Sequence, residues 1–166
     1  GASLRPSMEA RSPVVSSGAM SPLVDRTIAT VGSGVMAEAM IVGLLRGNLV
    51  TPSQVVASHP RAERRAALEE AHGIRVVASN AEAVDGADVV ILAVKPQTLA
   101  KVGREIAAHL RPGQLVLSVL AGPTTGALVA TLDHDQVVRA MPNTPARIGS
   151  GMTVWYATPA CTGDQR

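Results

Sequence analysis

The chain has 166 residues and a mass of 17.0 kDa, the size of a single domain. Its 15 basic and 13 acidic side chains leave a net charge of +2, and only 1% of the residues are aromatic, which argues against a nucleic-acid or membrane-surface protein. The lone Cys161 excludes an internal disulfide framework and a cysteine-based zinc cluster, and it suits a reducing, cytoplasmic location.

We predict a flexible arm over residues 1–26, either a tail or the remnant of a tag. This segment holds six Ser and three Pro and shows no sustained apolar period. A transit peptide is the alternative, because the segment also contains three Arg, but Glu9 and Asp25 oppose that interpretation. The remaining residues, 27–166, form the predicted domain.

Strands and helices alternate from residue 27 onward. The predicted strands cover residues 27–31, 54–58, 74–77, 88–94, 114–119, 136–141 and 152–156. The predicted helices cover residues 37–46, 61–72, 81–84, 97–110 and 125–132. Nearly continuous apolar strands separated by short helices are typical of a parallel sheet covered on both faces. We therefore predict an α/β fold with a doubly wound, mostly parallel sheet.

A glycine-rich turn directly follows the first predicted strand and opens the first helix. It matches the pattern G-x-G-x-x-A, and its residues are Gly32, Ser33, Gly34, Val35, Met36 and Ala37. The first glycine permits the tight turn, the second lets a pyrophosphate approach the backbone, and the small Ala37 allows close packing of helix on sheet. A purely structural turn is the alternative, but strand, turn and helix follow in the order that a Rossmann dinucleotide site requires.

The end of the second predicted strand carries Ser58, His59 and Arg61 and lacks an acidic residue. Sites selective for NAD place Asp or Glu there to bind the ribose diol, whereas a guanidinium pairs with the additional phosphate of NADP. We therefore expect NADP(H) to be preferred, with NAD(H) as the alternative. Arg61, Arg64 and Arg65 could instead form only the solvated face of a helix.

Three later strands also end in residues suited to a ligand crevice. Asn80 follows the third strand, Lys95 follows the fourth, and the small residues of Ser118–Gly122 end the fifth. Ligands of open α/β sheets bind at the carboxyl ends of the strands, so these positions are candidate contacts. A surface lysine before a helix is the alternative for Lys95, because Pro96 suits the first position of a helix.

Three blocks of the sequence resemble the amino-terminal part of pyrroline-5-carboxylate reductases. They are the glycine turn with Met36–Ala39, the segment from Asn80 to Gln97, and Arg139–Pro145 followed by Gly149, Gly151 and Met152. The resemblance implies a Rossmann domain and hydride transfer from NADPH or NADH to the C=N carbon of 1-pyrroline-5-carboxylate, which yields proline. It also implies a full-length protein that is a homodimer or larger.

The same resemblance assigns roles to individual residues. Residues from Gly32 to Ala37 would hold the pyrophosphate, and Ser58, His59, Arg61 and Asn80 the adenosine ribose end. The nicotinamide end would be lined by Ala93, Val94, Lys95, Pro96, Ala121 and Gly122. Asn143 and Thr144 would lie near the substrate, unless they only shape the Pro142–Pro145 loop. No metal is expected, since the four histidines lack ligand spacing, and we place His72, His109 and His134 on the surface.

The resemblance also implies a segment that this chain lacks, roughly a hundred residues forming a helical domain that dimerises and completes the substrate pocket. A capping-box pattern at Thr162–Gln165, followed only by Arg166, favours truncation as well. The proton donor is then expected in the missing segment, and the fragment alone is expected to be inactive. Two alternatives remain: another NADP-dependent enzyme, such as a β-hydroxyacid dehydrogenase, or a self-contained module that senses a dinucleotide.

Overall fold

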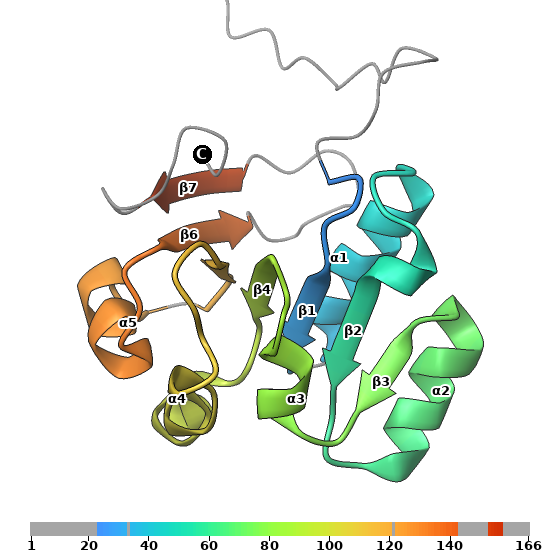
Figure 1. The fold of residues 1–166 in the computed structure, drawn as a ribbon, viewed down its shortest axis with the longest axis horizontal. Coiled ribbons are helices and arrows are strands. Elements are labelled where there is room, and N and C mark those ends of the chain that lie inside the picture. The colour runs from blue at the N-terminus through green and yellow to red at the C-terminus, as the bar shows by residue number, and fades with distance from the viewer. Residues whose placement is uncertain (1–22, 33, 121, 143–152, 158–166) are drawn as a thin grey trace, which may run out of the picture.

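The computed structural model describes residues 23–157 except for 33, 121 and 143–152. These residues form a seven-stranded sheet in the order β3-β2-β1-β4-β5-β6-β7 (Figure 1). The strands are β1 (Ile28–Val31), β2 (Val55–Ser58), β3 (Arg75–Val77), β4 (Val89–Leu92), β5 (Leu115–Ser118), β6 (Val137–Pro142) and β7 (Thr153–Ala157). Every pairing from β3 to β6 is parallel, and β7 pairs antiparallel with β6. The predicted doubly wound, mostly parallel sheet is confirmed.

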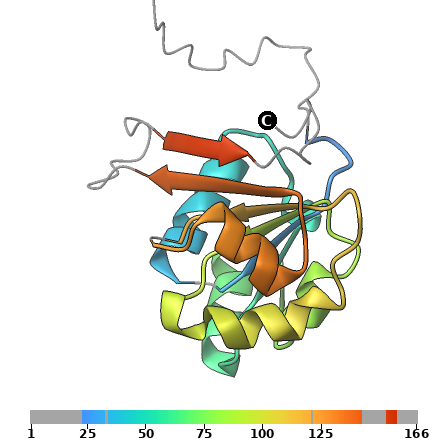
Figure 2. The same cartoon turned by 90° about the vertical axis from the view of Figure 1, so that its left-hand side faces the viewer.

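Helices cover the two faces of this sheet. They are α1 (Val35–Arg46), α2 (Ala62–His72), α3 (Asn80–Val84), α4 (Leu99–Ala107) and α5 (Thr125–Leu132), with single 3₁₀ turns at η1 (Pro52–Gln54) and η2 (Pro96–Thr98). Figure 2 shows α4 and α5 lying together on one side of the sheet. None of the helices in the described part of the chain is long and apolar enough to cross a membrane.

The side chains of β1 point alternately to the two faces of the sheet and belong to two separate core clusters. Ile28 packs in a cluster with Ile41 of α1 and Leu68 of α2, whereas Ala29 and Val31 pack with residues of α3, α4 and α5. Successive side chains of a strand point to opposite faces, so a fully buried strand needs apolar residues at nearly every position. This explains why the strands read as continuous runs of Val, Ile, Leu and Ala in a chain that has no Phe.

Two predicted elements are shorter in the structure by three residues or more. The strand expected over 88–94 pairs only over Val89–Leu92, because its neighbours β1 and β5 end at Val31 and Ser118 and the ladder has no further partner. The helix expected over 97–110 divides into η2 and α4. The backbone N–H and the hydroxyl of Thr98 both donate to the Lys95 carbonyl, at 2.9 and 2.8 Å, and this tightens the first turn.

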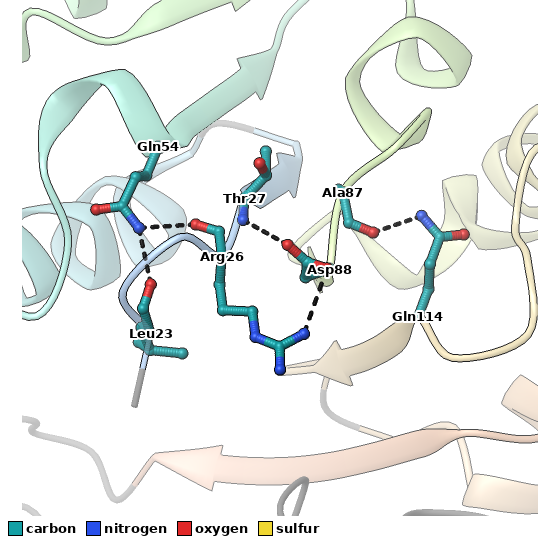
Figure 3. A network of polar contacts seen from close by, with 7 residues as sticks. All are labelled: Leu23, Arg26, Thr27, Gln54, Ala87, Asp88 and Gln114. Atoms are coloured by element: carbon teal, nitrogen blue, oxygen red, sulfur yellow. Dashed lines mark hydrogen bonds and ion pairs between the residues drawn. The ribbon is translucent and has the colours of Figure 1, made fainter. Parts of the chain in front are cut away.

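Residues 23–26, which the sequence placed in the arm, are tied to the amino edge of the sheet (Figure 3). The Gln54 amide donates to the carbonyls of Leu23 at 2.7 Å and Arg26 at 2.8 Å. The Asp88 carboxylate accepts from the Thr27 backbone N–H at 2.8 Å and lies 3.6 Å from the Arg26 guanidinium. These bonds fix the entry into β1, and the first 22 residues of the predicted arm lie outside the described part.

Candidate functional site

The first glycine of the turn after β1 meets the loop that follows β4. Gly32 has φ +85°, a conformation that L side chains rarely adopt. An added Cβ would lie 2.8 Å from the Ala93 carbonyl oxygen and 3.1 Å from a methyl carbon of Val94. Only glycine fits here, and the close approach brings two segments that the sequence assigned to one site into contact at the carboxyl edge.

The second glycine leaves open space in front of α1. Gly34 has φ −76° and ψ −171°, precedes the helix, and supplies no side-chain cap. A Cβ at this position would meet no described atom within 4 Å, and both Gly34 and Val35 are exposed. The first intrahelical bond runs from Glu38 N–H to the Gly34 carbonyl at 3.0 Å, so the amides before it point out of the helix end. A helix N-terminus with free amides favours the binding of an anion. Ser33, which lies between the two glycines, is outside the described residues.

The last three residues of the motif, Val35, Met36 and Ala37, form the first turn of α1. Ala37 is fully buried, as expected for a residue that lets α1 pack closely on the sheet. Val35 is 86% exposed, and Met36 is half-buried.

Ser58 lies at the carboxyl end of β2 but faces inward. Its side chain is buried, and its hydroxyl donates to Asn80 Oδ1 at 2.6 Å, with the Thr30 carbonyl 3.4 Å away. The parallel register places Ser58 between Val31 and Val77, the last paired residues of β1 and β3, which closes it off from solvent. The half-buried Asn80 is therefore the polar group that stands in front of Ser58 at this edge.

The three arginines after β2 have different environments. The Arg64 guanidinium bonds to Glu38 of α1 at 2.6 Å, and Arg65 donates to the carbonyls of His59 and Pro60 at 3.0 and 2.9 Å. Arg61 is exposed, and no ion pair ties its guanidinium to another described residue. Arg61 is therefore the cation of this group that can reach an incoming anion without breaking a contact.

His59 is held in the neutral form. Its Nδ1 accepts a hydrogen bond from the Arg61 backbone N–H at 3.0 Å, so this nitrogen carries no proton. Burial lowers the pKa of His59 below its ordinary 6.5, and the nearby charges of Arg64 and Arg61 lower it further. At neutral pH His59 contributes shape and a hydrogen bond to this loop, and the positive charge comes from the arginines.

The loops after β4 and β5 adjoin each other. The Ala93 N–H donates to the Val31 carbonyl at 3.0 Å, and the Val119 N–H donates to the Leu92 carbonyl at 3.2 Å. Lys95 and Pro96 are exposed, while Ala93 and Val94 are half-buried.

Gly122 lies in the loop after β5. It has φ +100°, and a Cβ there would meet no described atom within 4 Å. The described members of the nicotinamide group predicted from the sequence therefore lie on the neighbouring loops after β4 and β5. Ala121, Asn143 and Thr144 lie outside the described residues.

Three residues were misjudged or missed from the sequence. His72 was expected on the surface, but its side chain is only 13% exposed and its Nε2 bonds to the Glu38 carboxylate at 2.9 Å. His134 was expected on the surface, but it is buried. Its Nε2 bonds at 2.6 Å to the carbonyl of Gln114, the residue that precedes β5. Glu105 of α4 was not considered, yet its carboxylate accepts from Asn80 Nδ2 at 2.7 Å. An exposed acid on a helix gives no sequence signal of a partner 25 positions away.

A cavity of about 890 Å³ lies away from these loops, at the amino edge of the sheet on the α1 side. Its wall is mainly apolar and includes side chains of α1, β4 and β5, among them Met40, Leu44, Ile91 and Leu117. None of the candidate contacts lines it. An apolar hollow without backbone amides from a helix end does not suit a pyrophosphate, so the carboxyl edge remains the candidate site.

Comparison with known proteins identifies the family of the chain. A family model described as NADP oxidoreductase, coenzyme F420-dependent, matches residues 27–122, more than half of the chain. A curated pyrroline-5-carboxylate reductase of Pseudomonas aeruginosa is 47% identical over 131 residues, which cover 78% of this chain and 48% of that protein.

Solved structures give the same result. A pyrroline-5-carboxylate reductase from Coxiella burnetii is 31% identical with a TM-score of 0.79, over 84% of this chain and 52% of that one. The pyrroline carboxylate reductase of Plasmodium falciparum, solved with NADP bound, is 22% identical with a TM-score of 0.73, over 85% and 51%, and this likeness supports the fold alone. The chain spans about half the length of the relatives it matches.

Proposed function

The chain belongs to the family described as NADP oxidoreductase, coenzyme F420-dependent, and from that premise we propose that its carboxyl edge binds NADP(H). The observation that carries the proposal is the start of α1 behind Gly34, which has no side-chain cap and where an added Cβ would meet no described atom within 4 Å. The loops after β2, β4 and β5 follow the carboxyl ends of their strands at the same edge and carry polar, small and basic residues.

The parts of the dinucleotide divide over this edge. Residues 32–37 take the pyrophosphate, residues 58–61 and Asn80 take the adenosine ribose, and residues 93–96 with 121–122 take the nicotinamide end. When bound, the nicotinamide supplies the hydride, and the protein orients the reactants and excludes water. In this arrangement Ser58 contacts the Asn80 side chain and not the ribose, because its own hydroxyl is buried.

Arg61 is the residue we propose to select NADP(H) over NAD(H). A charge-assisted bond to the 2′-phosphate is worth about 1.5–3 kcal/mol, so Arg61→Ala is expected to weaken NADPH binding roughly tenfold or more and leave NADH binding nearly unchanged. Calorimetric titration of both cofactors measures the two affinities. Arg46→Ala, at the far end of α1, removes the same charge away from the site and is the matched control. Equal loss for both cofactors in Arg61→Ala, or wild-type binding that favours NADH, contradicts the assignment.

The activity we propose for the longer protein is reduction of 1-pyrroline-5-carboxylate to proline, with this chain supplying the cofactor half. The support is the 47% identity to the Pseudomonas reductase, together with a match to only half of its length. No residue of the described edge is a convincing general acid, so we expect this chain to bind cofactor without turning the substrate over. The substrate pocket is then completed by the remaining half.

The assay is NADPH oxidation in the presence of 1-pyrroline-5-carboxylate, run with this chain and with a version extended along its reading frame. Turnover by the extended chain alone is the expected result. Comparable turnover by both would place the whole active site within these residues. Binding of NADPH without turnover by either would favour a dinucleotide-sensing module or a different dehydrogenase. We further propose a cytoplasmic location, and a homodimer or larger assembly for the longer protein.

A further inference from the structure

The side chain of Asn80 is held from two sides at the carboxyl edge. Its Oδ1 accepts from the buried Ser58 hydroxyl at 2.6 Å, and its Nδ2 donates to the Glu105 carboxylate at 2.7 Å. These partners come from the end of β2 and from the last turn of α4, whereas Asn80 itself begins α3. Three elements therefore converge on one amide group.

The two partners differ in how strictly they fix the orientation of the Asn80 amide. A hydroxyl both donates and accepts, so Ser58 could receive a bond from a reversed amide and turn its own proton to the Thr30 carbonyl, which lies 3.4 Å away. A carboxylate only accepts, so a reversed amide would set its oxygen against the Glu105 oxygen. Ser58 tolerates either orientation of the amide, and Glu105 permits one.

We propose that Glu105 is a positioning residue for the cofactor: it fixes the orientation in which Asn80 presents its remaining N–H and its oxygen to the adenosine ribose. This inference rests on the proposed function. In dinucleotide folds, the end of the second strand is where a polar side chain meets that ribose. Here the residue at that end, Ser58, is buried, and the amide in front of it takes its place.

The orientation matters because a ribose hydroxyl pair needs donors and acceptors at defined places. A reversed amide would offer an oxygen where the ribose meets an N–H. Removing the carboxylate leaves the amide free to adopt both orientations, so part of the population presents the wrong group. The expected cost is that of one weakened hydrogen bond, which corresponds to a loss of NADPH affinity of roughly three- to tenfold.

The test compares Glu105→Gln with the wild-type chain, and Glu70→Gln on the exposed face of α2 is the control for loss of one negative charge. NADPH affinity is measured by calorimetry in wild-type and Asn80→Ala backgrounds, which makes a double-mutant cycle. We expect Glu105→Gln to weaken binding about three- to tenfold in the wild-type background and to have no further effect in Asn80→Ala. An equal loss in both backgrounds, or no loss in either, overturns the proposal.

A second measurement does not depend on the cofactor. The side-chain amide resonances of Asn80 in the ligand-free chain are expected to move or broaden in Glu105→Gln, while the backbone resonances of the β-sheet stay in place. Unchanged amide resonances overturn the proposal. A wild-type chain that binds no NADPH overturns the proposed function instead, and the amide resonances then still decide whether Glu105 orients Asn80.

Discussion

At the residue scale, the two glycines of one motif are required for different reasons. Gly32 has a positive φ and lies against the Ala93 carbonyl, so the folded backbone itself excludes a side chain. Gly34 has ordinary extended angles and an empty space where its Cβ would be. The fold therefore gives no steric reason for glycine at position 34, whereas the proposed pyrophosphate contact does.

Substitutions at these two positions are expected to separate stability from binding. Gly32→Ala should lower the free energy of unfolding by about 1–3 kcal/mol from backbone strain alone, and the contact with Ala93 adds to this. Gly34→Val should leave the thermal midpoint close to that of the wild type and abolish binding of NADPH and NADH alike. Thermal unfolding and calorimetric titration of both variants provide the check. A Gly34→Val chain that binds NADPH normally would remove the pyrophosphate from this turn.

Another residue-scale effect is a charge cluster that joins α1 to α2. Glu38 bonds to His72 Nε2 at 2.9 Å and to Arg64 at 2.6 Å. The bonds from His72 and then Arg64 hold the pKa of Glu38 below its ordinary 4.5. A carboxylate whose pKa is lower in the folded than in the unfolded chain stabilises the fold above its unfolded pKa, and the contribution is lost as the pH falls through the folded value.

Glu38→Gln is therefore expected to destabilise the chain at neutral pH and much less in acid. The side chains of Glu38 and Arg64 are about one-third exposed, so the effect at neutral pH is about 1 kcal/mol or less. Urea unfolding at neutral pH and near pH 3 gives both values. If the difference between variant and wild type stayed constant across that range, the stabilisation would not come from the ionised carboxylate.

At the element scale, α4 and α5 approach closely at one glycine. A Cβ on Gly103 would lie 2.6 Å from the Thr131 methyl carbon and 3.2 Å from the Thr131 carbonyl oxygen. Gly103 is buried within α4, where a glycine otherwise weakens a helix relative to alanine. The structure thus accepts a poor helix former because it allows two helices to pack side by side over β4–β6.

Gly103→Ala is expected to destabilise the chain by about 1–3 kcal/mol, because the gain in helix propensity is smaller than the cost of overpacking. Gly43→Ala in α1 is the matched control. It adds the same methyl group where no described atom lies within 4 Å, so it should stabilise the chain by about 0.5–1 kcal/mol. Urea unfolding of both variants measures the difference. The same sign for both would mean that α4 and α5 are not packed at Gly103.

The extent of sequence prediction also differs by element. The position and type of each regular element were predictable, because apolar runs and glycine or proline stops mark strands and helices in this fold. The ends of β4 and α4 were not, because they depend on where neighbouring strands stop and on the Lys95–Thr98 turn. Long-range polar partners such as Glu105 and His134 were not predictable either, since their bonds arise only when distant elements pack.

At the scale of the whole molecule, strand order assembles the candidate site. The chain builds β1, β2 and β3 outward in one direction and then returns to place β4 beside β1. The reversal leaves the loops after β1 and β4 adjacent, as the Gly32–Ala93 contact shows. Sequence motifs located most of the candidate contacts, because a parallel sheet brings the carboxyl ends of its strands to one edge. The apolar cavity lies at the opposite edge, next to the segment that enters β1.

The central claim, that the carboxyl edge of this sheet is an NADP(H) site, is tested most directly by titrating NADPH into isotope-labelled chain and following backbone amide resonances. We expect saturable binding of one cofactor, with the largest changes in the turn after β1 and in the loops after β2 and β4. Residues around the amino-edge cavity, such as Leu44 and Leu115, are expected to stay unchanged. No binding, or changes centred on that cavity, would rule out an NADP(H) site at the carboxyl edge.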